Sequence, residues 1–477
     1  MSRYAGLLGV LLISLAVDGS SARILPAAAL ALPRPPAVDA FLPHIRAQVL
    51  DAHRKALASP LNADASGYLG MVLHTYREYE VAAAWYTRAR MLALEAVRWT
   101  YLLAVAQDKA GRSPEAIANL REVLRHASTY QPARIRLADL LFAAGQLEES
   151  RRLYEAVLRE RPSSPEAHYG LARALAAKGE GSKAVGHYLE AVRLVPEFGA
   201  AHYALALVYR DLGEAEKTAH HLAWYRSHPL TEPPASDPWL VDVARLNMAP
   251  TVIIKRAESL IAEGRLDAAV GELERLVSVD PRNEPAHTGL AGLYGQLRQW
   301  DQAEMHFRRA IELNPNSLGA HFNYGRVLFE RQQYDEAAKV IRRALEIDPH
   351  DPRSHTLLGR VLERQGRRAE AIRHYRLALE ADPNQREAHY VLGLRLLADG
   401  NAKEGIAQLE RTLTPLDART PAYMRELAMA HERLGRRDRA RSYLREASRQ
   451  ASAMGRVGLA ASIDEERRRL EESGRRP

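Results

Sequence analysis

Histidine is the residue whose spacing in this sequence could support chemistry. One series of six consists of His168, His202, His287, His321, His355 and His389. A second series of four consists of His187, His221, His306 and His374. Imidazole nitrogens bind zinc and exchange protons near neutral pH, so the two series could form a metal centre or a catalytic site. The chain has no cysteine, which excludes thiolate ligands, thiol nucleophiles and disulfides.

The histidine spacing follows a longer internal repeat. EAHYGLARALAAKG, from Glu166 to Gly179, and EAHYVLGLRLLADG, from Glu387 to Gly400, carry histidine at the same point. Blocks of 34 residues in this register begin at Ala63, Val97, Gln131, Pro165 and Gly199, then at Pro250, Glu284, Leu318, Pro352 and Arg386, with a last block at Pro421. The two histidine series are positions 4 and 23 of these blocks. The regular spacing of the histidines therefore has two possible explanations: they are equivalent positions of a repeated structural unit, or they are ligands of a metal or catalytic site.

Small residues mark the architecture inside each block. Position 8 is always small, as Gly70, Ala104, Ala138, Ala172, Ala206, Ala257, Ala291, Gly325, Gly359, Gly393 and Ala428. Position 15 is glycine in eight blocks, which is typical of a chain leaving a helix. Position 20 is mostly alanine, and proline closes many blocks at position 32. Each block is predicted to be two closely packed helices joined by a turn.

This pattern resembles the tetratricopeptide repeat, which also has a 34-residue period, small residues at positions 8 and 20, a large residue at position 24 and proline at position 32. The resemblance covers most of the chain, although the tryptophan that the family carries at position 4 is absent throughout. It implies an all-α fold, an α-solenoid with a right-handed superhelix of about eleven helical hairpins in two arrays. Outer repeats of such arrays often deviate because they cap the stack.

The histidines of position 4 share a helix face with positions 7, 8 and 11, which pack against the partner helix. Equivalent positions in adjacent repeats lie roughly 8–10 Å apart, whereas zinc ligands each lie about 2 Å from one ion. Neighbouring histidines of one column therefore cannot chelate together, and packing is the favoured interpretation. A position-4 ring and a position-23 ring could still meet, which leaves a sparse zinc site as the alternative. No nucleophile elbow, phosphate-binding loop or complete zinc-protease motif is present, so we expect no enzyme, no cofactor and no metal.

The chain is predicted to divide into six segments. These are a signal peptide at 1–22, a Pro/Ala-rich linker at 23–40, an N-terminal array with a capping helix at 41–232, an inserted linker with a short helix at 233–249, a C-terminal array at 250–454, and a capping helix with a basic tail at 455–477. The first segment combines MSRY, the apolar run AGLLGVLLISLAV and small residues before the expected cut. We expect an exported protein, periplasmic or secreted, with no membrane span in its mature form. An uncleaved anchor is the alternative, and the small-residue stretch ILPAAALAL leaves the cut site open.

The net charge of +8 is concentrated at one end of the chain. Residues 433–477 hold 13 arginines and 7 acids, a balance of +6. Both signs alternate there at helical spacing, which indicates a solvated helix with ion pairs. We therefore expect no nucleic-acid partner, and no small-molecule substrate is evident.

Aromatic and arginine side chains fall on the face opposite the packing stripe. In the first helix of a block, positions 2, 5, 9 and 12 would line the inner surface of a curved stack. The candidate partner-binding groove consists of Tyr101, Tyr169, Arg173, Tyr203, Phe322, Arg326, Arg360 and Tyr390. Tyrosine and arginine are favoured in protein interfaces because they combine large contact area with a directional polar group. Tyrosine that merely covers backbone is the alternative.

One insertion interrupts the period. The 17 residues PPASDPWLVDVARLNMA lie between the blocks at Gly199 and Pro250, and they place Trp239, Leu240, Val243 and Leu246 near one face of a short helix. This helix could cover the end of the first array and join it to the second. It could also lie in the groove near Tyr169 and Tyr203 until a partner displaces it.

Taken with the family resemblance, these patterns predict an exported scaffold or adaptor that binds a protein or peptide partner and assembles a cell-envelope complex. A component of polysaccharide or protein secretion machinery is the alternative. An enzyme or metal protein that uses the histidine columns is the third possibility. Family members that clamp chaperone tails carry lysine at position 5 and asparagine at position 9, followed by asparagine at position 6 of the next repeat. Here Asn323 follows Thr288 and Gly292, so a chaperone-tail receptor is not expected.

Overall fold

The structure is a computed structural model that describes residues 32–34, 37–229, 233 and 237–473. These residues form 25 α-helices and no strand, which confirms the all-α solenoid. The predicted signal peptide at 1–22, and much of the linker at 23–40, lie outside the described residues. None of the helices in the described part is long and apolar enough to cross a membrane.

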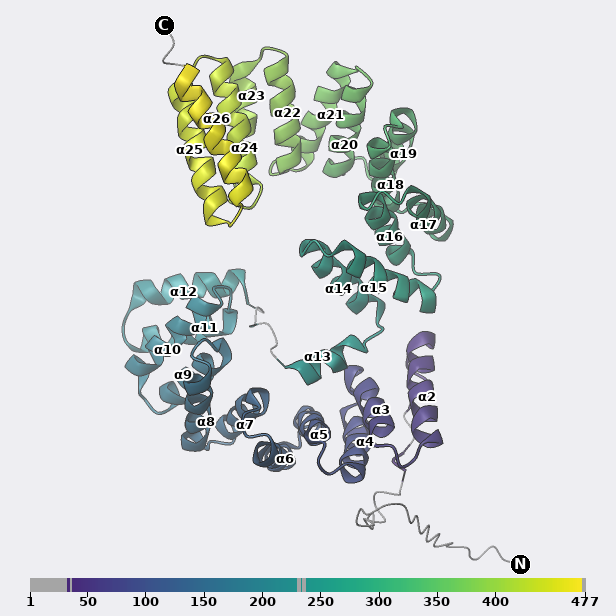
Figure 1. Ribbon diagram of the computed structural model, residues 1–477, viewed down its shortest axis with the longest axis vertical. Coiled ribbons are helices and arrows are strands. Elements are labelled where there is room, and N and C mark those ends of the chain that lie inside the picture. The colour runs from purple at the N-terminus through teal and green to yellow at the C-terminus, as the bar shows by residue number, and fades with distance from the viewer. Residues whose placement is uncertain (1–31, 35–36, 230–232, 234–236, 474–477) are drawn as a thin grey trace, which may run out of the picture. The chain divides into compact units, whose positions relative to one another are not determined.

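The chain separates after Ala249 into two compact units. The hairpins of the first unit pair α3 (Ala63–Thr75) with α4 (Tyr79–Leu92), α5 (Val97–Lys109) with α6 (Ser113–His126), α7 (Gln131–Ala143) with α8 (Leu147–Glu160), α9 (Pro165–Ala177) with α10 (Gly181–Leu194), and α11 (Gly199–Asp211) with α12 (Ala215–Ser227). Their first helices begin at the starts of the sequence blocks, so the 34-residue register predicts the helix boundaries of this unit (Figure 1).

The second unit holds six hairpins. They pair α14 (Pro250–Ala262) with α15 (Leu266–Val279), α16 (Glu284–Gln296) with α17 (Trp300–Leu313), α18 (Leu318–Glu330) with α19 (Tyr334–Ile347), α20 (Pro352–Arg364) with α21 (Arg368–Ala381), α22 (Arg386–Ala398) with α23 (Ala402–Arg411), and α24 (Thr420–Arg433) with α25 (Arg437–Ala453). The first helices of successive hairpins contact one another, α16 with α18, α18 with α20 and α20 with α22. We call the side of each unit that these helices form its first-helix surface.

The turn inside each hairpin uses the left-handed backbone region at block position 15. The eight glycines of that position all have positive φ, between 70° and 84°. In the other three blocks the position is held by Arg77, Arg298 and Gln332, whose φ values of 66°, 59° and 61° place non-glycine residues in the same conformation. The turn geometry is therefore common to every repeat, and three repeats adopt it with side chains that favour it less.

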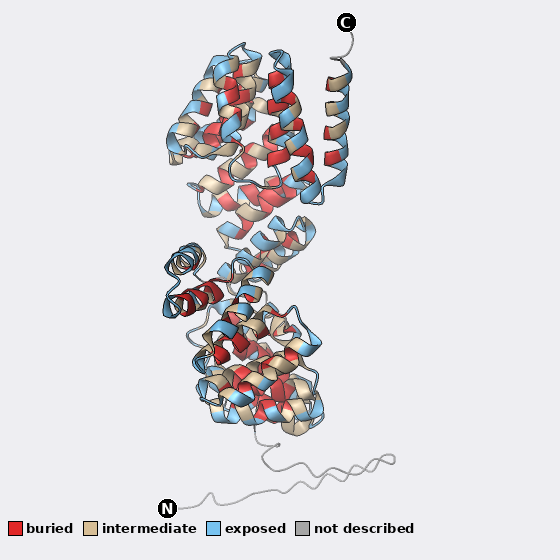
Figure 2. Ribbon diagram, turned by 90° about the vertical axis from the view of Figure 1, so that its left-hand side faces the viewer, coloured by how far each residue is buried: buried red, intermediate tan, exposed pale blue. Residues whose placement is uncertain are grey.

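The two helices of a hairpin approach closely at position 8. A Cβ atom added to Gly359 would lie 2.3 Å from Cε1 of Tyr375, and one added to Gly325 would lie 2.5 Å from Cγ1 of Ile341. Both contacted residues occupy position 24 of the same block, and both are buried. Figure 2 shows the buried residues gathered where helices face one another. The small residue at position 8 therefore leaves the space into which the large residue at position 24 packs.

Extra helices cover the ends and one side of the units. α2 (Pro43–Ala58) packs on α3 through Ile45, Val49, Ala52 and Ala56, all buried. α26 (Val457–Ser473) packs on α25 and contributes Ile463 and Leu470 to a buried cluster. The insertion forms α13 (Pro238–Arg245), which belongs to the first unit and contacts α3 and α5.

Gly359→Ala should lower the free energy of unfolding by about 1–3 kcal/mol, because the new methyl group must displace the packed ring of Tyr375. Gly271→Ala in α15 is the matched control, since nothing lies within 4 Å of its added Cβ. That control should gain about 0.5–1 kcal/mol from reduced backbone entropy. Urea denaturation followed by circular dichroism measures both, and equal effects of the two changes would contradict the close approach at position 8.

Candidate functional site

The position-4 histidines are anchored through one ring nitrogen. In all six, Nε2 lies 2.8–3.2 Å from the backbone carbonyl oxygen of the proline six residues earlier, which is position 32 of the preceding block. A carbonyl can only accept, so Nε2 carries the proton and Nδ1 is left as an acceptor. The histidine and proline columns of the sequence are therefore two halves of one contact across each repeat boundary.

The second nitrogen of these rings meets the position-23 column. His168, His202, His287 and His355 each place Nδ1 at 2.9–3.0 Å from Nδ1 of the position-23 histidine in the same hairpin. At His389 the side-chain amide of Gln408 lies 2.6 Å from Nδ1, and its NH2 group must face the ring because Nδ1 is an acceptor. In the remaining repeat position 23 is Val340, and Nδ1 of His321 is buried without a hydrogen-bond partner. Valine has no group that can bond to Nδ1, so this repeat folds without the contact between positions 4 and 23.

This geometry favours a structural role for the histidines over a metal site. In each of the four histidine pairs, the two facing nitrogens are hydrogen-bonded to each other. The other nitrogen of the position-4 ring is hydrogen-bonded to a carbonyl, so neither nitrogen of that ring is available to a metal ion. Among the described residues, no group of three or more histidine, aspartate or glutamate side chains is arranged to hold a metal ion. Burial, together with the neighbouring ring, lowers the pKa of His221, His306 and His374 to about 4. These rings are therefore neutral at neutral pH, and each donates its Nδ1–H to the position-4 ring.

The first-helix surface of the first unit is occupied by α13. Asp237 caps α13 by accepting a hydrogen bond from the backbone N–H of Leu240, and its carboxylate also accepts from the hydroxyl groups of Tyr101 and Tyr130. Arg136 donates to the Tyr101 hydroxyl at 2.7 Å and lies 3.6 Å from the Asp237 carboxylate. The side chain of Asp237 is buried, so this carboxylate is held by two hydroxyl groups and one guanidinium in place of water.

Aromatic rings form the rest of the surface on which α13 packs, which we call the α13 seat. The Trp239 ring lies 4.2 Å from the Tyr130 ring and 5.3 Å from the Tyr101 ring, centroid to centroid. Leu240 packs against the same core cluster, in which Val243 is buried. Tyr101 is fully buried, and burial raises its pKa. Trp239 and Leu240 therefore do cover a first-helix surface, and Tyr101 is beneath them.

The structure places α13 on the early repeats. It lies against Tyr101 and Tyr130, and the helices that it contacts most are α3 and α5. The hydrophobic pattern of the insertion predicted an apolar face that must be buried. It could not predict which repeat offers hydroxyl groups for a buried carboxylate.

The described residues leave a hollow beside the later repeats of this surface. Tyr169 and Arg173 line a hollow of about 500 Å³ that extends from Ile135 to Phe198 and is bordered by Asp237. Arg173 lies over the rings of Phe142 and Tyr169 and 3.6 Å from the carboxylate of Asp139. Tyr203 is 43% exposed and packs against Tyr225. The predicted residues beyond α13 are thus accessible, and Arg173 already has an acidic partner.

In the second unit, four of the predicted residues lie along the first-helix surface from α18 to α22. Phe322 is covered by Arg353, whose guanidinium lies 5.1 Å from the ring centroid. Arg360 pairs with Glu387 at 2.8 Å and lies over the Phe329 ring. Tyr390 packs against Tyr423 at 5.1 Å between centroids. These are half-buried cation–ring and ring–ring contacts, a surface with large apolar area and charged edges.

The fourth, Arg326, lies in a hollow formed by α14, α16 and α18. The volume is about 530 Å³, and the lining includes Ile254, Ile261, Gly292 and Asn323. Nη2 of Arg326 donates to the carbonyl of Gly292 at 3.2 Å, and Nδ2 of Asn323 donates to the carbonyl of Thr288 at 3.0 Å. Both side chains therefore lie along the neighbouring helix α16.

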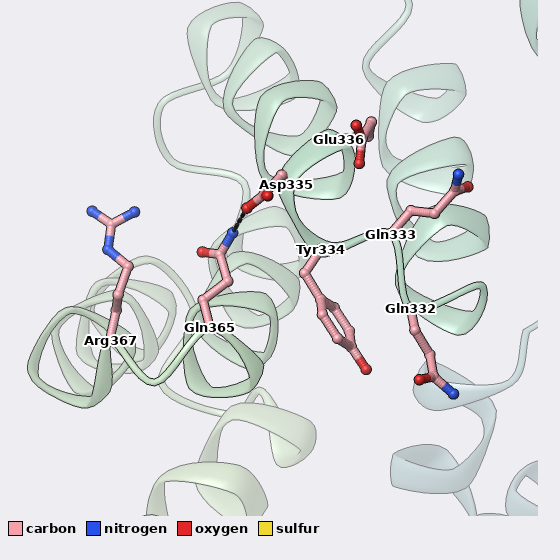
Figure 3. Close-up of a pocket in the computed structure, with 7 residues that line it drawn as sticks. All are labelled: Gln332, Gln333, Tyr334, Asp335, Glu336, Gln365 and Arg367. Atoms are coloured by element: carbon pink, nitrogen blue, oxygen red, sulfur yellow. Dashed lines mark hydrogen bonds between the residues drawn. The ribbon is translucent and has the colours of Figure 1, made fainter.

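A further hollow of about 570 Å³ lies at the hairpin turns beside α19 and α21 (Figure 3). Its lining is polar, and Nε2 of Gln365 donates to Asp335 at 2.7 Å. Figure 3 shows the other labelled side chains, Tyr334, Gln333 and Gln332 among them, pointing in different directions. This hollow has no convergent set of groups that would define a site.

Sequence reasoning missed three residues of the α13 seat. Asp237 was available, because aspartate before proline is an N-cap signal. Tyr130 and Arg136 occupy block positions 34 and 6, which are outside the stripe that the helical period selects. Their role depends on the insertion that returns to them, so the repeat pattern alone gives no signal.

Family models agree with the repeat pattern. Models described as Tetratricopeptide repeat match residues 108–160, 260–305 and 296–361, and, for a second model, 135–197. A model described as Anaphase-promoting complex, cyclosome, subunit 3, matches residues 330–412. No curated protein matches the chain in sequence.

Distant likeness to solved structures is also present. The yeast Tom70 crystal structure is 15% identical, with 86% of this chain and 96% of Tom70 covered at a TM-score of 0.41. PilW, titled a widely conserved type IV pilus biogenesis factor, is 21% identical, with 45% and 97% covered at 0.37. Pseudomonas aeruginosa pilF is 20% identical, with 42% and 90% covered at 0.36. These resemblances are too distant to carry a functional assignment.

The histidine pairs predict an acid-sensitive fold. Because folding lowers the pKa of His306 from 6.5 to about 4, the unfolded chain binds this proton at a higher pH than the folded chain. The contribution of His306 to stability is therefore present above pH 6.5 and is lost as the pH falls toward 4. His306→Gln copies the natural Gln408 and should weaken this pH dependence, measured as the thermal unfolding midpoint in the presence of a chelator. His350→Gln, at an exposed position, is the control, and an unchanged dependence in His306→Gln would contradict the assignment.

Proposed function

The chain belongs to the tetratricopeptide repeat family, and from this premise we propose that it is an exported scaffold that binds a protein or peptide partner and assembles a complex in the cell envelope. The fold is that of a protein-interaction scaffold. The binding surface, the compartment and the kind of complex are what we propose beyond this fold.

The docking of α13 is the observation that carries the proposed mode of binding. A short helix lies on the first helices of consecutive repeats, with its tryptophan against two tyrosine rings and its capping carboxylate on hydroxyl groups. The chain thus contains one example of a helix bound by its own first-helix surface. The same kind of surface in the second unit carries Phe322, Arg360 and Tyr390, side chains that suit a protein partner.

The lining of the second unit supports binding rather than catalysis. Arg353 and Arg360 lie over aromatic rings, Arg360 also pairs with Glu387, and the amide of Asn323 is bonded to the neighbouring helix. No nucleophile with an adjacent base was found in the sequence motifs. Large rings with charged edges provide contact area and orientation, which is what a partner segment needs.

Export is proposed from the first 22 residues, which have a basic start, a short apolar run and small residues before the cut. A scaffold outside the cytoplasm would meet other envelope components. The same surface would serve a component of polysaccharide or protein secretion machinery, and the captured partner decides between these two roles.

Export predicts that the full chain, tagged at its C-terminus, accumulates in the osmotic-shock fraction as a shortened species. Leu11→Arg with Leu12→Arg interrupts the apolar run and should keep the chain in the cytoplasm at full length. Immunoblots of cell fractions measure both. A full-length species in the membrane fraction would identify an uncleaved anchor, and cytoplasmic unaltered chain would overturn export.

Partner capture should depend on the first-helix surface of the second unit. Phe322→Ala with Tyr390→Ala removes two rings from that surface and should lower the amount of partner recovered from envelope extract by about tenfold or more. Met305→Ala is the matched control, since Met305 is 56% exposed on α17, a second helix. Thermal unfolding midpoints of both variants establish that the chain remains folded. Equal recovery by the two variants would remove this surface from partner binding.

A further inference from the structure

We propose that the hollow formed by α14, α16 and α18 binds a partner peptide through a carboxylate that pairs with Arg326, next to large apolar side chains that pack on Ile254 and Ile261. This inference rests on the proposed function and names the chemistry of the partner. The peptide carries an aspartate or glutamate close to an aliphatic or aromatic residue.

Arg326 differs from the two other arginines at position 9 of the first helices. Arg173 has the carboxylate of Asp139 at 3.6 Å, and Arg360 has that of Glu387 at 2.8 Å. Among the described residues, no carboxylate lies within 4 Å of the Arg326 guanidinium. Position 9 thus carries an arginine paired with a carboxylate in two repeats and, in a third, an arginine with no carboxylate of the described residues within 4 Å.

The surroundings of Arg326 hold the guanidinium in the hollow. Its Nη2 donates to the carbonyl of Gly292 on the neighbouring helix, and a Cβ atom at Gly292 would lie 3.6 Å from that nitrogen and 3.0 Å from Nδ2 of Asn323. A side chain at Gly292 would therefore crowd the amide of Asn323 and would come into contact with the guanidinium of Arg326. Burial lowers the pKa of Arg326, and the carboxylates of Glu330 and Glu387 offset only part of that effect.

The acids near the hollow do not fill this role. Glu284 accepts hydrogen bonds from the hydroxyl groups of Thr288 and Ser317, at 2.5 Å and 2.6 Å. Glu330 and Glu387 act on Arg326 only through space. Glu258 lines the hollow from α14 and forms no ion pair with Arg326 within 4 Å. A carboxylate from outside the unit would meet a preplaced donor, and such charge-assisted bonds are among the stronger polar contacts.

Apolar area lies beside the unpaired cation. Ile261 is 36% exposed, and Ile254, Leu293 and Gly289 line the same hollow. In the first unit, an arginine beside apolar side chains already has a carboxylate partner, which comes from the same chain. There Arg136, on the first helix of the third hairpin, lies beside the Asp237 carboxylate while Trp239 and Leu240 pack next to it. Arg326 is also on the first helix of the third hairpin of its unit, so the pattern of acid followed by apolar residues suits both.

Fluorescence anisotropy with the full chain tests this directly. The probes are short helix-forming peptides of alanine, glutamine and leucine that differ at one position, which is Asp, Asn or Lys. The Asp peptide should bind about tenfold more tightly than the Asn peptide, as expected for a hydrogen-bonded charge pair. The preference should disappear in Arg326→Gln and be retained in part in Arg326→Lys. The Lys peptide should bind more weakly than the Asn peptide.

Arg343→Gln is the matched control, because it removes the same charge from α19 of the same repeat, where Arg343 pairs with Glu346. It should keep the preference for Asp. Equal affinity of the Asp and Asn peptides, binding of none of them, or a preference that survives Arg326→Gln would each overturn the assignment. Thermal unfolding of Arg326→Gln shows whether a loss reflects unfolding, in which case Arg326→Lys decides. Failure here with successful capture on Phe322 and Tyr390 would leave the scaffold role intact and remove only the carboxylate site.

Discussion

The close approach of two helices within each hairpin is the constraint on which the rest of the structure depends. A side chain at Gly359 or Gly325 would occupy the space of the large residue at position 24. Because these helices touch at that level, the turn between them must be short, and position 15 adopts positive φ in every repeat. The packing face of each first helix is thereby fixed, and so is the opposite face, on which the proposed binding residues lie.

The sequence predicted the features that repeat and not those that occur once. Eleven small residues in one register are enough to place the helices, since ten first helices begin where the blocks begin and α24 begins one residue early. The left-handed conformation at Arg77, Arg298 and Gln332 was not visible, because the signal for it is glycine. At those positions the pressure of the hairpin geometry outweighs the local preference of the side chain.

The proposed binding surface was partly predictable for the same reason. Helical periodicity identified the face that holds Phe322, Arg326, Arg360 and Tyr390, and these residues do lie along one surface. It also placed Tyr101 on an open groove, whereas the structure buries Tyr101 beneath α13. Periodicity tells which way a side chain points, but coverage by a distant segment depends on a single long-range contact, here the Asp237 carboxylate on two tyrosine hydroxyl groups.

The histidine–proline contact has a mechanical consequence. It ties one repeat to the next at six boundaries, and each tie resists a change in the angle between neighbouring hairpins. The boundaries from α3 to α5 and from α5 to α7 lack it, since position 4 holds Thr100 and Arg134, and these are the joints that α13 spans. At the boundary before α24, Arg386 instead bonds the carbonyl of Thr412 and the carboxylate of Asp417. Each unit is therefore stiffened at its repeat boundaries. At the two boundaries that lack the histidine–proline contact, α13 bridges the neighbouring hairpins instead.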